Sequence, residues 1–265
     1  MNFMESRTSQ SKTKDILSIR ALTKRYGRFT AVDSLSFDVK QGEVFGLLGP
    51  NGAGKSTLIK MLTCFHKPTS GDALVDGVSI RDQSAIRELV GWAPQEDAFY
   101  RNLTVLENLR YFGTLYGMRI DEIYARANQL LSLLQLRDKI DARAGSLSGG
   151  MRRRLNMGIA MMHRPKVLYL DEPTAGVDPL SRMSLWDVVE EVRKEGISVL
   201  LCTHYLDEAE KLCDRVAIVR SGKLVIVDTP NNLKKKYGHT LEDAFKNLLS
   251  KSEQKKEMDK IPKKE

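Results

Sequence analysis

A glycine-rich stretch early in the chain has the composition and spacing of a phosphate-binding loop. Its glycines allow consecutive backbone N–H groups to close around phosphate oxygens, and Lys55 can reach the β- and γ-phosphates. The Ser56 hydroxyl is a ligand for Mg²⁺. The residues that we assign to nucleotide binding in this loop are Gly49, Pro50, Asn51, Gly52, Ala53, Gly54, Lys55, Ser56 and Thr57.

The flanking residues predict the strand and the helix that such a loop requires. Residues 43–48 form an apolar run typical of a buried strand, and a helix is predicted from Ser56 to about Cys64. The positive end of this helix would point at the phosphates. A glycine-rich turn without a ligand is the alternative, and the order strand, loop, helix argues against it.

Two adjacent acids follow a second apolar run. Residues 167–170 are bounded by charged residues on both sides, which is typical of a buried parallel strand. Ligands of open α/β sheets collect at the carboxyl ends of such strands. Because neighbouring strand residues point to opposite sides, we expect Asp171 to support the Mg²⁺ shell and Glu172 to position and polarise an attacking water. Acids that merely begin a solvated loop are the alternative, which the phosphate-binding loop makes the weaker one.

A third motif, Leu-Ser-Gly-Gly-Met at residues 147–151, predicts a second anion site. Ser148 stands where a helix N-cap belongs. Gly149 and Gly150 would let a phosphate approach the first turn of a helix that runs from Met151 to about His163. The chain therefore carries two helix ends that could each bind an anion.

Together these motifs resemble the nucleotide-binding domain of the ABC ATPase family, over about Leu17 to Pro230. All of the motifs stand in the family's order. The further matches are Tyr26, Gln95, the loop 175–178 that ends in Asp178, and the pair Thr203 and His204.

The resemblance implies a role for each of these residues. Tyr26 would stack on adenine, and Gln95 would join the Mg²⁺ ligands and link Mg²⁺ and the water to a transmembrane partner. His204 would contact the γ-phosphate and Glu172, and Asp178 would belong to the nucleotide-binding residues. The alternatives are a Tyr26 ring packed on the sheet edge, an ordinary loop amide at Gln95 and a hydrogen-bonded structural histidine at His204.

The same resemblance places the phosphate-binding loop and the Leu-Ser-Gly-Gly-Met motif on opposite flanks of the domain. One chain cannot then bring both to the same γ-phosphate, so two copies must face each other head to tail. Each ATP would be held between Lys55 of one protomer and Ser148 of the other, and hydrolysis would remove the ligand that holds the interface. We therefore expect a homodimer in the ATP-bound state.

Length and composition agree with a globular protein that works at a membrane without entering it. The chain has 265 residues, of which 42% are hydrophobic, enough for a substantial core. No apolar run approaches the roughly 18 residues needed to span a bilayer. With the family resemblance, this implies a cytoplasmic protein, peripheral on the inner face of the cell membrane, with an integral membrane transporter subunit as its partner. Reduced core thiols are expected at Cys64, Cys202 and Cys213.

The predicted fold is α/β, with a P-loop NTPase core, an antiparallel β portion and an inserted α-helical subdomain. We expect a flexible tail over residues 1–15, an ABC ATPase domain over 16–230 with its helical subdomain at about 96–160, and a basic helical extension over 231–265. Early strands are predicted near Leu17–Ala21, Ser36–Lys40, Ala73–Val75 and Val90–Ala93.

Apolar residues recur at three- and four-residue steps between Leu103 and Leu136, which predicts helices there. In the family this region receives a short cytoplasmic helix of the membrane subunit. An ordinary helix start with core residues is the alternative. The docking candidates are Phe99, Tyr100, Leu103 and residues 104–108.

The C-terminal region is basic. A hairpin around Ser221 and Gly222 is expected to lead into a helix that starts at Thr229. Residues 234–265 hold ten lysines against six acids, a net charge of +4 out of +8 for the chain. This segment could lie near anionic headgroups, but we favour a solvated tail from Ser250. The basic run 152–154 is interpreted as a solvated helix face, so no nucleic acid is expected.

Other classes of ABC ATPase fit the chain less well. A chromosome-associated ATPase would carry a long coiled coil between the first and third motifs, which here lie only about a hundred residues apart, and a translation factor would carry two sets of motifs. A lone ATPase that regulates a cytosolic complex remains as the alternative to a transporter subunit. Met151 and the sequence Gly176-Val177-Asp178 resemble the subclass that exports drugs, lipids or polysaccharides. The transported substrate cannot be read from this chain.

Overall fold

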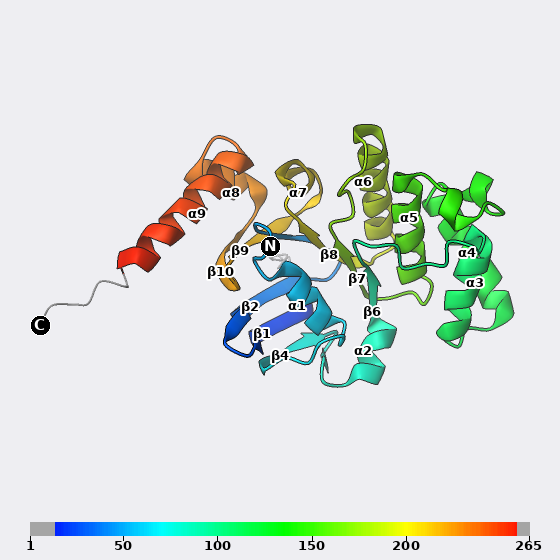
Figure 1. Cartoon of the computed structure of the whole chain (residues 1–265), viewed down its shortest axis with the longest axis horizontal. Coiled ribbons are helices and arrows are strands. Elements are labelled where there is room, and N and C mark those ends of the chain that lie inside the picture. Colours follow the sequence, from blue (N-terminus) through cyan, green and yellow to red (C-terminus); the bar gives the residue numbers. More distant parts are fainter. Residues whose placement is uncertain (1–13, 259–265) are drawn as a thin grey trace, which may run out of the picture.

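A six-stranded sheet forms the centre of the molecule (Figure 1). The computed structural model describes residues 14–258, with side chains to residue 250. The strands of this sheet are β3 (Val44–Leu48), β6 (Val90–Ala93), β7 (Val167–Asp171), β8 (Ser198–Thr203), β9 (Arg215–Arg220) and β10 (Lys223–Asp228). Their order is β10-β9-β3-β8-β7-β6, and β10 alone runs antiparallel to its neighbour.

Alternate residues of the central strands enter two different hydrophobic cores. In β7, Leu168 and Leu170 belong to the core shared with helices, whereas Tyr169 belongs to the core beneath the second sheet. All five residues of β7 are buried. Burial on both faces explains why the central strands appear in the sequence as continuous apolar runs.

A second, antiparallel sheet covers one face and has the order β2-β1-β4-β5. Its strands are β1 (Asp15–Tyr26), β2 (Phe29–Lys40), β4 (Ser70–Val75) and β5 (Val78–Ser79). The predicted versions of β1 and β2 were too short. Ala21 and Ser34 have positive φ angles, and the pairing of β1 with β2 shifts register near both residues. These irregularities interrupt the alternation of apolar and polar residues on which the prediction depended.

Helix α1 (Lys55–Leu62) packs into the core between the two sheets, with Leu58, Ile59, Met61 and Leu62 buried. It ends two residues before the predicted Cys64, because Thr63 leaves helical geometry and Cys64 has a φ of 60°. Cys64 is partly buried, whereas Cys202 and Cys213 are buried, and all three are free thiols.

Helices occupy both ends of the molecule (Figure 1). One end holds α3 (Val105–Leu115), α4 (Ile120–Leu133) and α5 (Gly149–Ala160), a group that we call the helical region. Thr104 and Glu107 close a capping box that starts α3. The remaining helices are α2 (Gln83–Leu89), α6 (Pro179–Lys194), α7 (Leu206–Leu212), α8 (Pro230–Tyr237) and α9 (Leu241–Met258).

The C-terminal hairpin and the helix after it lie where the sequence predicts them, but the predicted tails differ from the observed bounds. Ser221 and Gly222 both have positive φ in the turn between β9 and β10, and Thr229 caps α8. Asp15, expected in the N-terminal tail, is the first residue of β1. Helix α9 continues past Ser250 to Met258 where a solvated tail was expected, and residues 1–13 and 259–265 lie outside the described part of the chain. Within residues 14–258, no helix has the length and apolar character needed to cross a bilayer.

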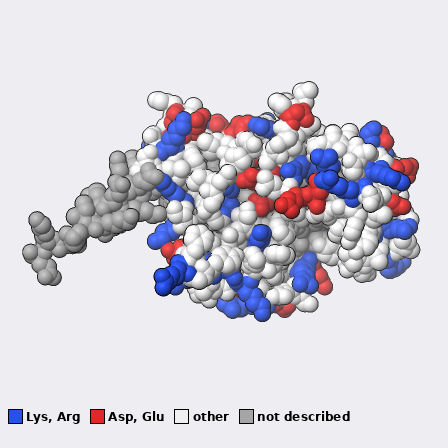
Figure 2. Space-filling view, in the orientation of Figure 1, with Lys and Arg blue, Asp and Glu red and all other residues white. Residues whose placement is uncertain are grey.

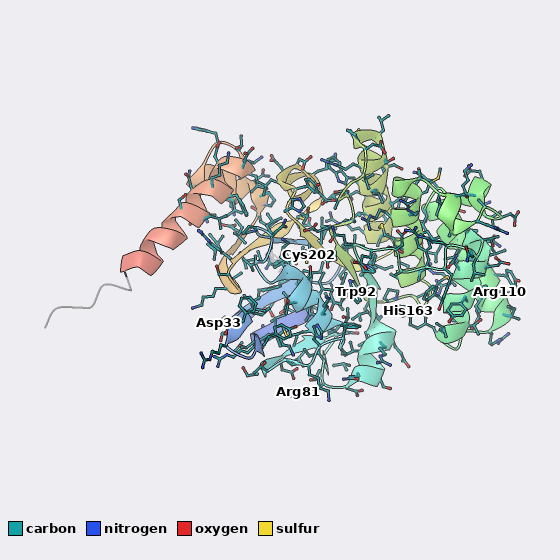
Figure 3. The ribbon with its side chains drawn as sticks, in the orientation of Figure 1. Asp33, Arg81, Trp92, Arg110, His163 and Cys202 are labelled. Atoms are coloured by element: carbon teal, nitrogen blue, oxygen red, sulfur yellow. The ribbon has the colours of Figure 1, made fainter. Side chains whose placement is uncertain are left out.

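His163 joins the helical region to the central sheet (Figure 3). Its Nε2–H donates to the carbonyl oxygen of Val90 at 3.0 Å, and its ring stacks on Tyr116 with centroids 3.9 Å apart. Its Nδ1 is buried without a partner. Burial lowers the pKa of His163 to about 4, with the nearby Arg126 lowering it further and the hydrogen bond to Val90 opposing the shift.

This half-buried histidine predicts a loss of stability in mild acid. The unfolded chain takes up a proton near pH 6.5, the folded chain only near pH 4. Stability is therefore complete above pH 6.5 and falls as the pH drops towards 4, by about 3 kcal/mol for this shift. In His163→Gln, which keeps a donor for Val90 but does not titrate, urea titrations should show a smaller decrease over this range. The exposed His239→Gln should behave like wild type, and an equal slope in His163→Gln would contradict the assignment.

Candidate functional site

The phosphate-binding loop is held by close backbone contacts at Gly49 and Gly54, which leave no room for a side chain at either position. A Cβ on Gly54 would lie 2.3 Å from the carbonyl oxygen of Ala31, and one on Gly49 would lie 2.4 Å from that of Val219. Gly54 also has a φ of 102°. The loop thus depends on glycine both for its conformation and for its close approach to β2 and β9.

A turn from the C-terminal hairpin supports the same loop. The Gly222 N–H donates to the carbonyl oxygen of Ala53 at 3.0 Å, and the Asp33 N–H donates to the carbonyl oxygen of Gly222 at 2.8 Å. The loop is therefore fixed from two directions by residues that are distant in the sequence.

Helix α1 starts without the features that cap the other helices of the site. Its N-cap is Gly54, no side chain caps it, and its first turn holds no acid, whereas Ser148 caps α5 and Asp178 caps α6. Its first N–H groups are left to bind an anion. A cavity of about 410 Å³ adjoins them, lined by Phe29, Ala31, Gln95, Glu172 and residues 51–57. The Lys55 ammonium belongs to this cavity and donates to the carbonyl oxygen of Gly49 at 2.7 Å.

Ser56 and Asp171 meet beside this cavity, as a Mg²⁺ site requires. The Ser56 hydroxyl lies 3.3 Å from Asp171 Oδ1, and Asp171 is 6% exposed at the end of β7. Burial raises the pKa of Asp171, while the hydrogen bond from Ser56 lowers it. One hydroxyl and one carboxylate suit Mg²⁺, which takes few protein oxygens and keeps phosphate oxygens and waters.

Glu172 does not continue the strand, contrary to the prediction that two adjacent strand residues point to opposite sides. The strand ends at Asp171, and Glu172 takes a left-handed φ of 50°. Its N–H donates to the carbonyl oxygen of Cys202 at 2.8 Å, which fixes this turn to β8. The two carboxylates still diverge, but through a strained turn whose cost is on the order of 1–2 kcal/mol.

The turn brings Glu172 to His204 and Lys55. Glu172 Oε1 lies 3.1 Å from His204 Nδ1 and 3.9 Å from Lys55 Nζ. His204 directly follows β8 and packs against the ring of Tyr205. The contact between His204 and Glu172 that the family resemblance implied is present.

A buried acid near His204 was missed by sequence reasoning. Glu208 on α7 is 0% exposed, and its carboxylate faces Thr174, Thr203 and Trp186 without a well-formed hydrogen bond to any of them. Burial raises its pKa, and these three side chains oppose the rise. Glu208 thus lies between the loop after Glu172 and the strand that carries His204. Because α7 also carries Asp207, Glu210 and Lys211, no signal in the sequence marks Glu208 as the buried one.

The position of Tyr26 leaves its proposed stacking role open. It is 45% exposed at the end of β1, where Phe29 is its partner across the hairpin. Lys24 Nζ lies 5.1 Å from the Tyr26 ring centroid, and His66 packs edge-on against that ring. Phe29, which the sequence reasoning did not single out, lines the cavity of the phosphate-binding loop.

The Leu-Ser-Gly-Gly-Met motif lies at a separate cavity of about 570 Å³, which we call the second cavity. Ser148 Oγ accepts from the Met151 N–H at 3.3 Å, and helix α5 begins at Gly149 rather than at the predicted Met151. Gly149 lines this cavity and has open space beside it. Gly150 instead packs on α6, because a Cβ there would lie 2.7 Å from Ser181 Cβ.

Gln95 is the residue common to both cavities. It follows β6 and faces the phosphate-binding loop on one side and α5 on the other. Asp178, also assigned to the nucleotide site, caps α6 by accepting from the Ser181 N–H at 3.0 Å. Hydrogen bonds from Ser181 lower the pKa of Asp178. Its role towards nucleotide stays a prediction.

The basic run 152–154 is not the solvated face that was expected. Arg153 donates to the carbonyl oxygen of Ala175, Arg154 donates to Gln135 and Ser184, and burial lowers the pKa of both arginines. Basic and acidic side chains are also interspersed on the face shown in Figure 2.

The docking candidates divide into buried and exposed residues. Phe99 is 9% exposed and belongs to the core, as do Val105 and Asn108 among the buried residues. Tyr100 is 50% exposed, and its ring packs edge-on against Tyr111 on α3. Among the candidates, Tyr100 and Glu107 are exposed, and Tyr100 adjoins the exposed Tyr111. Phe99 is removed from the docking candidates because it is buried.

Comparison with known proteins agrees with this arrangement. Residues 32–175 match the family described as ABC transporter. Among solved structures, the chain is similar to the ATP-binding subunit of an ABC transporter, with a TM-score of 0.79, 28% identity and coverage of 88% of this chain and 99% of that one. It is also similar to cbiO1 from Clostridium perfringens, with a TM-score of 0.78, 30% identity and coverage of 84% and 92%. The chain belongs to the ABC transporter family and has the ABC ATPase fold.

Its curated relatives are ATP-binding proteins. It is 40% identical over 241 residues to the probable multidrug ABC transporter ATP-binding protein YbhF of Escherichia coli (strain K12), which covers 88% of this chain and 42% of that protein. It is 40% identical over 224 residues to the linearmycin resistance ATP-binding protein LnrL of Bacillus subtilis (strain 168), covering 84% and 72%. For the Nod factor export ATP-binding protein I of Ralstonia nicotianae, the identity is 42% over 219 residues, covering 82% and 68%. The chain thus spans less than half of YbhF.

Proposed function

We propose that this chain binds and hydrolyses ATP to drive export of a substrate through a separate integral membrane subunit. The observation that carries the proposal is the convergence of Lys55, the pair Ser56 and Asp171, and the pair Glu172 and His204 on one cavity. This arrangement supplies a phosphate cradle, a metal site and a polarising carboxylate, which are the parts that phosphoryl transfer to water requires.

Each residue has a distinct task in this proposal. Ser56, Asp171 and Gln95 would hold Mg²⁺, which neutralises charge on the β- and γ-phosphates when bound. Lys55 binds the same phosphates. Glu172 orients the attacking water and accepts its proton as a general base. His204 keeps the Glu172 carboxylate oriented through the 3.1 Å contact between them.

The direction of transport follows from the relatives. Their names refer to multidrug transport, linearmycin resistance and Nod factor export, so we assign this chain to export and not to the regulation of a cytosolic complex. Such a role places it in the cytoplasm, on the inner face of the membrane. We further propose residues 16–230 as the ATPase domain, with the helical region as its subdomain (about 96–160), and residues 231–265 as an extension.

The assignment of Glu172 is tested by Glu172→Gln. The amide cannot accept the proton of water, so we expect ATP binding to be retained while the rate of hydrolysis falls by about 10²–10⁴-fold. Fluorescent nucleotide binding and phosphate release measure the two effects. The exposed Glu210→Gln serves as control and should hydrolyse ATP normally. Near-normal turnover in Glu172→Gln would contradict the role, and loss of binding would show a structural or metal-binding one.

A second copy of the chain completes each nucleotide site in our proposal. Neither Ser148 nor Gly149 lines the cavity that holds Lys55, and Gly149 lines the second cavity instead. A γ-phosphate bound at Lys55 therefore needs the open helix end of another cassette to be enclosed on its far side. Head-to-tail pairing of two copies places one Ser148 at each of the two nucleotide sites.

The dimer is tested with Glu172→Gln, in which ATP should persist. Binding to the closed state alone stabilises it by about 2.7 kcal/mol at a hundredfold excess over Kd, which should make a dimer visible by size exclusion at micromolar protein. Adding Ser148→Arg should abolish this dimer because the long side chain fills the helix end. Ser84→Arg, exposed on α2, should leave it intact. A monomer at saturating ATP, or a dimer despite Ser148→Arg, would rule out this homodimer.

We propose that Tyr100 and Tyr111 contact the membrane subunit. Their rings form an exposed aromatic pair at the start of the helical region, close to the loop that carries Gln95. Replacing both tyrosines by glutamate should lower the amount of chain that cosediments with membranes of its source cells by about tenfold or more. This is the size of effect expected when an aromatic anchor of an interface is lost. Tyr124→Glu, equally exposed on α4, should not. Equal recovery of all three variants would place the docking surface elsewhere.

A further inference from the structure

A buried asparagine on α5 holds the loop that carries Gln95. Asn156 is 2% exposed. Its Oδ1 accepts from the Ala98 N–H at 3.0 Å, and its Nδ2 donates to the carbonyl oxygens of Glu96 at 2.7 Å and Pro94 at 3.4 Å. One side chain thus satisfies backbone groups on both sides of Gln95. The Asn156 amide itself is buried, so leaving it unpaired would cost more than losing an exposed hydrogen bond.

An ion pair links the same two elements near the helix start. The Asp97 carboxylate lies 3.6 Å from Arg152 Nε on α5 and 2.8 Å from Arg101 Nη2. Asp97 is only 18% exposed as a side chain, so water screens this contact less than it would a surface pair. Residues 94–98 are therefore attached to α5 at two points, a neutral clamp and a charged one.

The attachment of residues 94–98 to α5 matters because it joins two elements that each line a cavity. Gln95 lines the cavity of the phosphate-binding loop, whereas Gly149, at the start of the same α5, lines the second cavity. Strand β6 ends at Ala93, so the clamped segment begins directly after the sheet. A movement of α5 against the sheet must then move Gln95 against Lys55 and Ser56.

We propose that Asn156 is a positioning residue that makes Gln95 and helix α5 move as one body, so that the two nucleotide sites of a dimer are coupled through it. The inference rests on the proposed function. A phosphate bound by the Ser148 end of α5 fixes that helix in one protomer. Because Asn156 ties α5 to the loop, the same phosphate also fixes Gln95 of that protomer. Gln95 serves the second nucleotide, which is bound by Lys55 of the same protomer.

The chain contains a matched control for the loss of a buried amide. Asn108 on α3 is 0% exposed and holds another loop in the same way, accepting from the Tyr100 N–H at 2.8 Å and donating to the carbonyl oxygens of Tyr100 and Thr104. It does not touch residues 94–98. Asn108→Ala therefore measures what the loss of a buried clamp does to folding alone.

The test compares Asn156→Ala and Asn108→Ala in the full chain. Both should lower the midpoint of thermal unfolding. Asn156→Ala should in addition lower kcat by about ten- to a hundredfold, since a small misplacement of a positioning group is enough for that, while Mg²⁺-free ATP binding stays within about twofold of wild type. Hydrogen exchange at the Ala98 amide should accelerate in this variant alone. Asn156→Ser, which keeps one donor and acceptor, should recover part of kcat and provides a folded variant if alanine is not tolerated.

The outcomes separate the inference from the proposed function. An equal decrease of kcat in Asn156→Ala and Asn108→Ala would show a merely structural role and overturn the inference. Normal kcat in a folded Asn156→Ala would do the same, as would unchanged exchange at Ala98. If the wild-type chain binds ATP without hydrolysing it, the proposed function fails, and the exchange measurement still decides whether Asn156 holds this loop.

Discussion

Parallel pairing of β8 with both β3 and β7 is the constraint on which the site depends. Leu48 pairs with Thr203, and Asp171 pairs with Cys202, so the three strands end level with one another. The loop after β3, the acids after β7 and His204 after β8 are therefore delivered to one edge of the sheet. Their side chains need only short turns to converge, and the left-handed turn at Glu172 is the one place where the backbone takes on strain to do so.

In the proposed function, the sheet edge provides half of a nucleotide site, and the helical region provides the other half for a second copy. Two kinds of contact join these parts. Apolar packing holds the helical region to the sheet, whereas hydrogen bonds and an ion pair through His163, Asn156 and Asp97 hold β6 and the loop after it. The first kind tolerates small rotations, because apolar packing is non-directional. The second is directional, because hydrogen bonds weaken steeply when their geometry is lost.

The sequence allowed prediction wherever chemistry and local pattern coincide. The glycines and Lys55 of the first loop, the capping role of Ser148 and the hairpin at Ser221 all follow from residue types at fixed spacing. Strand β1 was predicted too short because a positive φ at Ala21 breaks its alternation. Phe99 was misassigned to the surface because a pattern of apolar residues does not show which of them face the core. Asn156 and Glu208 were missed because their partners are distant in the chain, and polar residues without a local partner give no signal in a single sequence.

The contact between Gly222 and Ala53 has a consequence for how the protein is made. The carbonyl oxygen of Ala53 in the phosphate-binding loop accepts from the Gly222 N–H, which lies in a hairpin far along the sequence. Closing so long a segment costs conformational entropy, and such contacts form late in folding. A nascent chain on the ribosome that has not yet exposed Gly222 can fold its central strands but lacks this support for the loop. The candidate nucleotide site is thus completed only after Gly222 has emerged, well after its own motif.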